Sequence, residues 1–241
     1  MNCSLCGLGR PLSKSHIIPE FIYSPLYDEK HRFHILSTLK ARPRPTEQKG
    51  IREDLLCADC ERQISRYERY ARGVLFGGVE IIATRNDENI EIYNIDYKLF
   101  KLFQLSLLWR ANVASHRMFS RVNLRRHESA IREMIQRDNP RSYDKYGCIL
   151  FGLAGDTGAE FGFIDQPTRV RLESHWCYRF IFGGLVWVFF VSSHQPNQYL
   201  RSHFLQESGY LRIWVKPFAD LAYLREFAVD LHKMGRLRKP G

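Results

Sequence analysis

Residues 50–70, GIREDLLCADCERQISRYERY, contain the pattern that decides how the N-terminal part of this chain folds. Cys57 and Cys60 are separated by two residues, and the apolar residues that follow recur every three or four positions, which predicts that a helix begins at this pair. The N-terminal sequence MNCSLCGLGR contains a second pair with the same spacing. Two such pairs supply four thiolates, the ligand set of many tetrahedral structural zinc sites. The spacing therefore predicts a structural Zn²⁺ bound by Cys3, Cys6, Cys57 and Cys60.

The composition is that of a globular protein with an excess of positive charge. The 241 residues are 44% hydrophobic and 26% charged, and 36 Lys and Arg against 26 Asp and Glu give a net charge of +10. Such a charge attracts nucleic acid, although it also serves solubility. Six cysteines are too few for a secreted disulfide scaffold, and the N-terminus has no signal-peptide pattern. We therefore expect a cytoplasmic protein whose cysteine pairs hold a metal.

The sequence pattern predicts an α+β protein with two domains. In residues 1–78 the cysteine pairs enclose an extended segment around His16 and precede the helix that begins near Cys57. A zinc knuckle held against the first turn of a helix is the treble-clef arrangement, which we expect to bring His16 near Glu61. Residues 79–241 predict a second domain in which helices are mixed with an antiparallel sheet. No sequence feature gives this second domain a role.

The elements of the second domain are predicted from periodicity and from turn residues. Residues 79–95 predict a β-hairpin. Asp96 is the predicted N-cap of a helix, extending to about residue 118, that is apolar on nearly every side and therefore belongs in a core. The apolar run at residues 180–191 is well short of the roughly 20 residues that a membrane helix needs, so it predicts buried strands. Further helices are predicted at residues 126–137 and 220–234, and Cys148 and Cys177 are predicted core residues.

The order of residues in the first domain resembles that of the HNH, or ββα-metal, endonucleases. A Cys-x-x-Cys pair is followed by SKSH at residues 13–16, and then by Leu-Cys-x-x-Cys with an acid, Glu61, directly after it. The branch that encloses a four-cysteine structural zinc, such as recombination endonuclease VII-like proteins and bacterial HNH proteins, is the most similar. The resemblance covers residues 1–75. It implies hydrolysis of DNA phosphodiester bonds, with RNA as an alternative substrate, in bacterial defence or mobile-element biology.

The resemblance also implies roles for individual residues and a catalytic Mg²⁺ or Mn²⁺ in addition to the structural zinc. His16 falls at the position of the general base and Glu61 at the position of a ligand to the catalytic metal, roles that suit an imidazole and a carboxylate. Ser15 stands where the family frequently has a second ligand, Asp or His. The Asn of the family motif is missing, and Glu53 or Asp54 is the nearest substitute for it.

Each of these assignments has an alternative. His16 is compatible with a buried histidine whose hydrogen bonds are satisfied, and Glu20 and Glu68 are alternative acids. Glu61 is compatible with a first-turn acid that stabilises a helix N-terminus by about 0.3–1 kcal/mol. The missing Asn leaves open a zinc module without nuclease activity that binds nucleic acid or a protein partner.

Four arginines on the predicted helix at residues 57–75 form the predicted nucleic-acid contact. Their spacing of four, three and three residues places them on one broad helical face, where they can bind phosphates without reading sequence. The alternative is a solvated face on which they pair with Asp59 and Glu68. These residues are Arg62, Arg66, Arg69 and Arg72.

Overall fold

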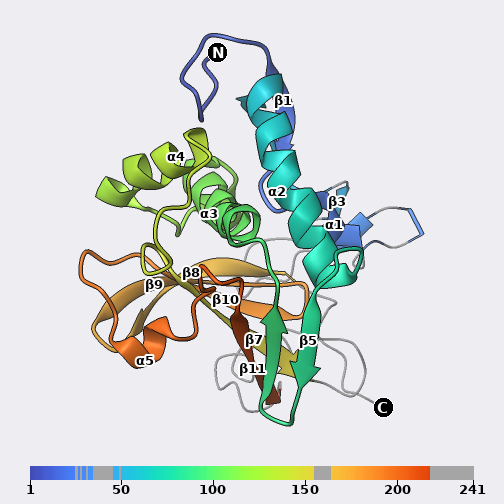
Figure 1. The fold of residues 1–241 in the computed structure, drawn as a ribbon. Coiled ribbons are helices and arrows are strands. Elements are labelled where there is room, and N and C mark those ends of the chain that lie inside the picture. The colour runs from blue at the N-terminus through green and yellow to red at the C-terminus, as the bar shows by residue number, and fades with distance from the viewer. Residues whose placement is uncertain are drawn as a thin grey trace, which may run out of the picture.

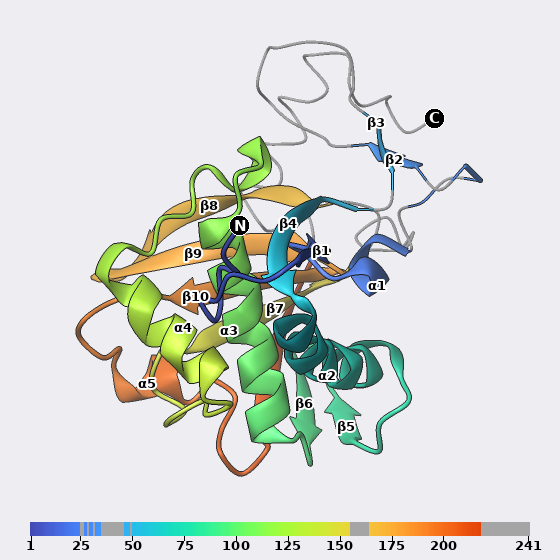
Figure 2. The same cartoon turned by 90° about the horizontal axis from the view of Figure 1, so that it is seen from above.

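The computed structural model of this protein describes residues 1–24, 27, 29–30, 32–34, 46–48, 50–154 and 164–217. The predicted helix at residues 220–234 lies outside this part of the chain. The fold is α+β, as predicted, and the helix α3 (Tyr97–Val113) lies over a large sheet with α2 on one side of it and α4 on the other (Figures 1 and 2). No helix among these residues is both long enough and apolar enough to span a bilayer.

The large sheet of the described residues has seven strands and is antiparallel at every pair except β11–β7. The predicted hairpin at residues 79–95 is confirmed by β5 and β6, and the predicted strands at residues 180–191 are confirmed by β9 and β10. Gly183 and Gly184 join β9 to β10 with φ of +61° and +71°, the left-handed conformation that a two-residue hairpin loop requires. Across the sheet the strands are β5 (Ile82–Arg85), β6 (Asn89–Tyr93), β11 (Leu211–Pro217), β7 (Cys148–Ala154), β10 (Leu185–Phe190), β9 (His175–Phe182) and β8 (Asp165–Leu172).

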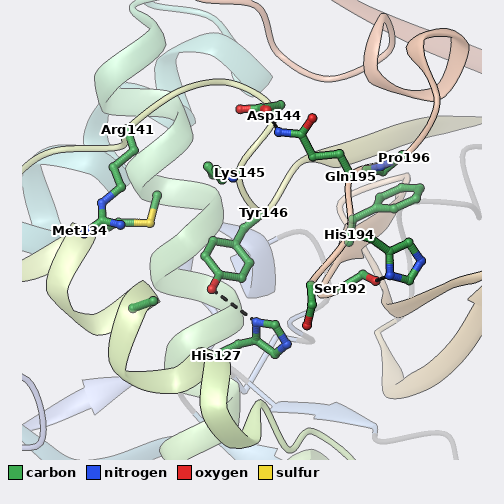
Figure 3. Close-up of a pocket in the computed structure, with 13 residues that line it drawn as sticks. His127, Met134, Arg141, Asp144, Lys145, Tyr146, Ser192, His194, Gln195 and Pro196 are labelled. Carbon is green, nitrogen blue, oxygen red and sulfur yellow. Dashed lines mark hydrogen bonds between the residues drawn. The ribbon is translucent and has the colours of Figure 1, made fainter.

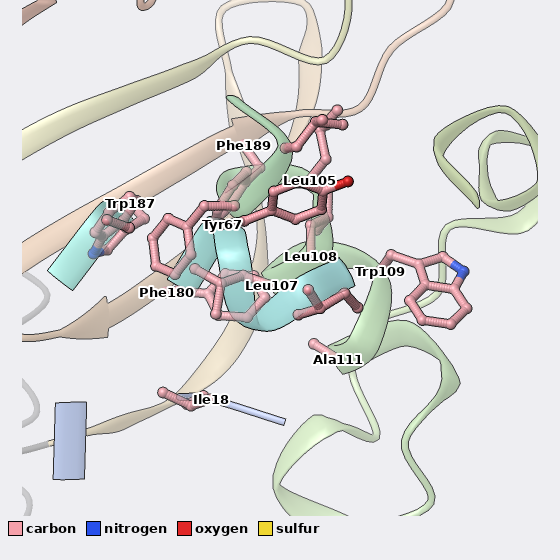
Figure 4. Packing of buried hydrophobic residues seen from close by; sticks show 14 of the residues in the cluster. Ile18, Tyr67, Leu105, Leu107, Leu108, Trp109, Ala111, Phe180, Trp187 and Phe189 are labelled. Carbon is pink, nitrogen blue, oxygen red and sulfur yellow. The ribbon is translucent and has the colours of Figure 1, made fainter. Parts of the chain in front are cut away.

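The helix α3 is the centre of the main core. Its predicted N-cap is confirmed, because the side chain of Asp96 accepts a hydrogen bond of 2.9 Å from the N–H of Leu99. Every residue from 100 to 111 is buried, and the aromatic rings of Phe100 and Phe103 pack against Trp187 of the sheet (Figure 4 shows the cluster). The helix ends at residue 113, about one turn earlier than predicted.

The N-terminal residues form a hairpin and a long helix that pack on α3. Strand β1 (Leu12–His16) pairs antiparallel with β4 (Arg52–Cys57), and the chain passes directly from β4 into α2 (Ala58–Phe76), which confirms the predicted helix start. Between the two strands lie α1 (Glu20–Tyr23), β2 (Arg32–His34) and β3 (Thr46–Gln48). The apolar face of α2, which includes Ile64, Tyr67, Ala71 and Val74, joins the same buried cluster as α3. The boundary at residue 78 stays a prediction, and the core is continuous across it.

The remaining helices pack beside α3 or join a second apolar cluster. Helix α4 (Glu128–Gln136) follows the short helices η2 (Arg117–Phe119) and η3 (Arg125–His127) beside α3. Helix α5 (Gln198–Arg201) contributes Leu200 to a second apolar cluster, which contains Cys177. Cys148 belongs to the main core, so both cysteines are core residues, as predicted.

Candidate metal centre and neighbouring polar groups

The fold brings the two Cys-x-x-Cys pairs together at the start of α2. The four Sγ atoms of Cys3, Cys6, Cys57 and Cys60 all lie within 4.8 Å of one another, and Cys6 Sγ is 3.9 Å from Cys57 Sγ. A tetrahedral zinc ion with Zn–S bonds of about 2.3 Å keeps its sulfur ligands about 3.8 Å apart. All four thiols are free, and a separation of 3.9 Å is far longer than a disulfide bond of about 2.05 Å. The cluster therefore fits a zinc ion.

The backbone around the first pair has the turn that such a site needs. The N–H of Gly7 donates a hydrogen bond of 2.8 Å to the carbonyl of Cys3, and Gly7 has φ of +75°, a conformation that glycine adopts without strain. The N–H of Cys57 points at Cys3 Sγ at 3.3 Å, and the N–H of Ser4 bonds to the carbonyl of Leu55 at 3.0 Å. The N-terminal turn is therefore fixed to the end of β4 by the protein itself.

The thiols of the cluster differ in how readily they lose a proton. Burial opposes the ionisation of Cys57, but the N–H of Cys60 and the neighbouring thiols offset it and lower the pKa of Cys57 to about 7. Burial and the hydrogen bond to Cys57 raise the pKa of Cys60 above its ordinary value. One thiolate is thus readily available to a cation, and a bound Zn²⁺ ion favours deprotonation of the others.

The predicted base, His16, is at the end of β1 and is paired with a carboxylate. Its Nε2 lies 2.6 Å from Oε2 of Glu20, the first residue of α1. The side chain of His16 is 24% exposed, so the ring is accessible from solvent. The hydroxyl of Tyr27 donates a hydrogen bond of 2.8 Å to the other oxygen of Glu20. The pair has the geometry of a histidine that is oriented by an acid.

A buried ion pair holds the backbone of His16. Arg110 of α3 donates a hydrogen bond of 2.7 Å from Nη1 to the carbonyl oxygen of His16, and the same nitrogen is 2.6 Å from Oε1 of Glu68 on α2. The Arg110 side chain is 2% exposed. Glu68, a predicted alternative acid, is therefore an ionic partner of the core helix that supports the end of β1.

The predicted metal ligand, Glu61, lies one residue after the last cysteine in the first turn of α2. Its Oε1 is buried and has no hydrogen-bond partner among the residues that the structure describes. Burial of a carboxylate oxygen without a hydrogen-bond partner costs free energy of folding. Coordination of a cation by that oxygen would offset this cost. In the described part of the chain no hydrogen bond or ion pair joins Glu61 to His16, so a shared metal site stays a prediction.

The three residues predicted as a second metal ligand are engaged in other contacts. Ser15 is buried, and its Oγ accepts a hydrogen bond of 3.2 Å from the N–H of Leu56. Glu53 accepts three hydrogen bonds of 2.8–2.9 Å, from the N–H and hydroxyl of Ser115 and from the N–H of His116. Asp54 pairs with Lys14 at 2.8 Å at the surface. Each has a structural role that does not involve a metal.

The predicted phosphate contacts are divided between paired and unpaired arginines. All four are exposed on α2, but Arg62 pairs with Asp59, and Arg66 pairs with Asp138 at 3.1 Å. Arg69 and Arg72 have no acidic partner among the described residues, so no neighbouring carboxylate competes with a ligand for them. The alternative prediction is that these arginines pair with Asp59 and Glu68. Asp59 does pair with Arg62, but Glu68 pairs with Arg110 of α3.

Sequence reasoning gave Glu20 only as an alternative acid and did not identify Arg110. Glu20 lies four residues after His16, but the contact spans the end of β1, a bend and the first residue of α1, so no helical spacing predicts it. Pro19 predicts an extended segment there, and it has extended dihedrals (φ −57°, ψ 146°) as the N-cap of the short helix α1, which begins one residue later. Arg110 is 94 residues away from His16, and no local pattern identifies its contact.

Comparison of this chain with protein-family models, with curated proteins and with solved structures gives no match in any of the three.

Proposed function

We propose that this protein is a metal-dependent nuclease of the HNH type, in which β1, β4 and α2 form a treble-clef, ββα-metal unit around a structural zinc. The observation that carries the proposal is the His16–Glu20 pair at 2.6 Å, located on the hairpin whose opposite end is held by the four-cysteine cluster. DNA is the proposed substrate because its phosphates match the net charge of +10, and RNA is the alternative.

His16 acts as the general base in this proposal. Nε2 of His16 lies 2.6 Å from Glu20 Oε2, so the carboxylate orients the imidazole that takes the proton of the attacking water. The Glu20 carboxylate then stabilises the imidazolium that forms, as the acid of a catalytic triad does. Arg110 fixes the His16 backbone, so the ring stays in the position from which it can act.

Glu61 is the residue that we propose as a ligand to Mg²⁺ or Mn²⁺, because its buried Oε1 has no partner in the described residues. Such an ion supplies charge stabilisation at the scissile phosphate. The cysteine cluster supplies no oxygen ligands, so the structural zinc and the catalytic ion require separate sites.

The test is nicking of a supercoiled plasmid by the zinc-loaded protein in the presence of Mg²⁺ or Mn²⁺. We expect cleavage that needs the added divalent ion, an increase of at least about 10-fold in the ion concentration required by Glu61→Gln, and a loss of at least about 100-fold in rate for His16→Ala. His232→Ala is the matched control, because that residue has no predicted role. Equal rates for His16→Ala and the control would exclude His16 as the base.

A second candidate function is a zinc module that binds nucleic acid without cutting it. The observation that favours it is the engagement of Ser15 and Glu53 with backbone groups, which leaves Glu61 as the one acid of the predicted ligand set without a partner among the described residues. This candidate predicts salt-dependent binding of DNA with no nicking under any divalent ion.

A further inference from the structure

The edge of the sheet contains a groove that is formed by elements outside the hairpin and α2. It has a volume of about 570 Å³ and lies between strands β8 and β9, the turn at residues 123–127 and the segment that follows β10. A second hollow of about 330 Å³ adjoins it and shares His127 and His194 with it (Figure 3). No residue of the predicted nuclease site lines either of them.

The groove presents an aromatic ring with arginines around it. Trp176 lines the groove and is 43% exposed, which is unusual for so large an apolar side chain. The guanidinium carbon of Arg169 lies 3.7 Å from the centroid of its indole ring, and that of Arg171 lies 5.8 Å from it. These distances are within the range of a cation–π interaction. The Arg169 guanidinium lies over one face of the indole, and the two groups together form a positively charged stacking platform.

The positive charge around this platform is not neutralised. Arg125, Arg126, Arg169 and Arg171 are exposed, and none has an acidic partner in the part of the chain that the structure describes. The acids of this region are engaged elsewhere: Glu128 accepts a hydrogen bond from Trp109 at 2.9 Å, and Glu173 accepts one from Asn197 at 3.2 Å. Four uncompensated arginines beside an exposed ring suit a ligand that is both anionic and flat.

We propose that this groove binds a single strand of nucleic acid, with a base stacked on the Trp176–Arg169 platform, and the phosphates held by Arg125 and Arg126, which line the groove, and by Arg171 beside Trp176. A single strand is chosen over a duplex because a base exposes its face only when it is unpaired and unstacked. The site goes beyond the proposed nuclease, since it is a separate surface that binds the polymer without cutting it.

The test measures binding of fluorescein-labelled oligothymidylate by anisotropy, in the His16→Ala background, at NaCl concentrations from 50 to 200 mM. We expect Trp176→Ala to weaken binding about 5- to 30-fold and Trp176→Phe, which keeps a ring for stacking, to stay within about 3-fold of the parent. Tyr199→Ala, which removes a ring that is 65% exposed on α5, is the matched control and should change binding less than 2-fold.

The charge is tested by the salt dependence of the same binding. Arg171→Gln should reduce the slope of log affinity against log salt by about 0.7, the value for one phosphate contact with a single strand. Arg85→Gln, on the strand at the opposite edge of the sheet, should leave the slope unchanged.

Three results would overturn the inference: no binding by the parent at 50 mM salt, equal losses for Trp176→Ala and Tyr199→Ala, or an equal loss of single-strand and duplex binding by Trp176→Ala. Because the readout is binding in a background without the proposed base, a protein that fails to cleave any substrate can still confirm this groove. Conversely, cleavage that depends on His16 together with no effect of Trp176→Ala on binding would exclude the groove as a binding site and would still support the proposed nuclease.

Discussion

Arg110 donates a hydrogen bond of 2.7 Å to the carbonyl oxygen of His16, which joins the last turn of α3 to the end of β1. The guanidinium is almost fully buried, and its ionic partner Glu68 comes from a third element, α2. The backbone of the candidate base, His16, is thus held in place by a side chain of the buried core. The cysteine cluster fixes the opposite end of the same hairpin, where Leu12 faces Cys57.

Replacement of Arg110 by Met should strongly destabilise the protein. The change leaves Glu68 without its ionic partner in a mostly buried position, and loss of one partner of such a pair costs about 3–5 kcal/mol. Urea denaturation followed by circular dichroism measures the loss, and Arg72→Met, an exposed position on α2, should cost less than about 0.5 kcal/mol. The double variant with Glu68→Gln should recover part of the loss. Equal stability of the two Arg→Met variants would show that the pair is not important.

Glu53 should act as an anchor for the chain after α3 and not as a metal ligand. Glu53→Gln weakens three hydrogen bonds to residues 115 and 116 and should reduce the free energy of unfolding by about 1–3 kcal/mol. The divalent-ion concentration that gives half-maximal nicking should stay within about 2-fold of the parent value. A large rise in that concentration with an unchanged free energy of unfolding would contradict this role and show that Glu53 binds the catalytic metal.

Asp138 should make stability depend on pH in the acid range. Its carboxylate accepts a hydrogen bond of 2.6 Å from Tyr67 and pairs with Lys98 at 2.6 Å and Arg66 at 3.1 Å. Burial opposes ionisation, but these partners together hold the pKa of Asp138 below its ordinary value of 3.8. The charged form is therefore favoured by folding, so this stability is present above about pH 4 and is lost as pH falls through the folded pKa.

The measurement for Asp138 is the free energy of unfolding from pH 7 to pH 3. Asp138→Asn should reduce it by about 1–3 kcal/mol at pH 7, and the difference from the parent should shrink below about pH 4. Asp87→Asn, in the exposed β5–β6 turn, should follow the parent at every pH. A difference that grows as the pH falls would have the wrong sign for this account.

Zinc should be required for the N-terminal fold. Purified protein should contain about one zinc per chain, and Cys57→Ser should lose the metal and lower the melting temperature. Cys148→Ser is the control, because Cys148 is a core cysteine outside the cluster and its replacement should keep the zinc. Metal analysis by mass spectrometry measures the zinc content of the parent and of both variants. A zinc content well below one per chain, with no loss of fold on chelation, would show that the four cysteines do not bind a structural zinc.

The local elements of this protein can be predicted from the sequence because their signals are local. The spacing of Ile64, Tyr67 and Ala71 gives α2, and Asp96 with a long apolar run gives α3. The cysteine cluster is predictable for the same reason, since each pair is a short motif. The assignment of Cys148 and Cys177 to the core followed from their apolar neighbours.

Contacts between distant segments could not be predicted. Strand β11 lies between β6 and β7, and no periodicity indicates that the last described strand belongs in the middle of the sheet. The same applies to Glu53, whose partners at residues 115 and 116 are 62 and 63 residues away. The sequence shows that Glu53 is an acid near the cysteines, but only the fold shows which donors it faces.

The measurement that decides whether this protein is a nuclease is the rate of plasmid nicking with Mn²⁺ by the parent and by His16→Ala, compared at equal zinc content per chain. Equal zinc content ensures that both proteins carry the same folded metal centre. We predict metal-dependent nicking by the parent and a loss of at least about 100-fold in the variant. Nicking at the same rate by both proteins, or no nicking by the zinc-loaded parent, would contradict the proposal.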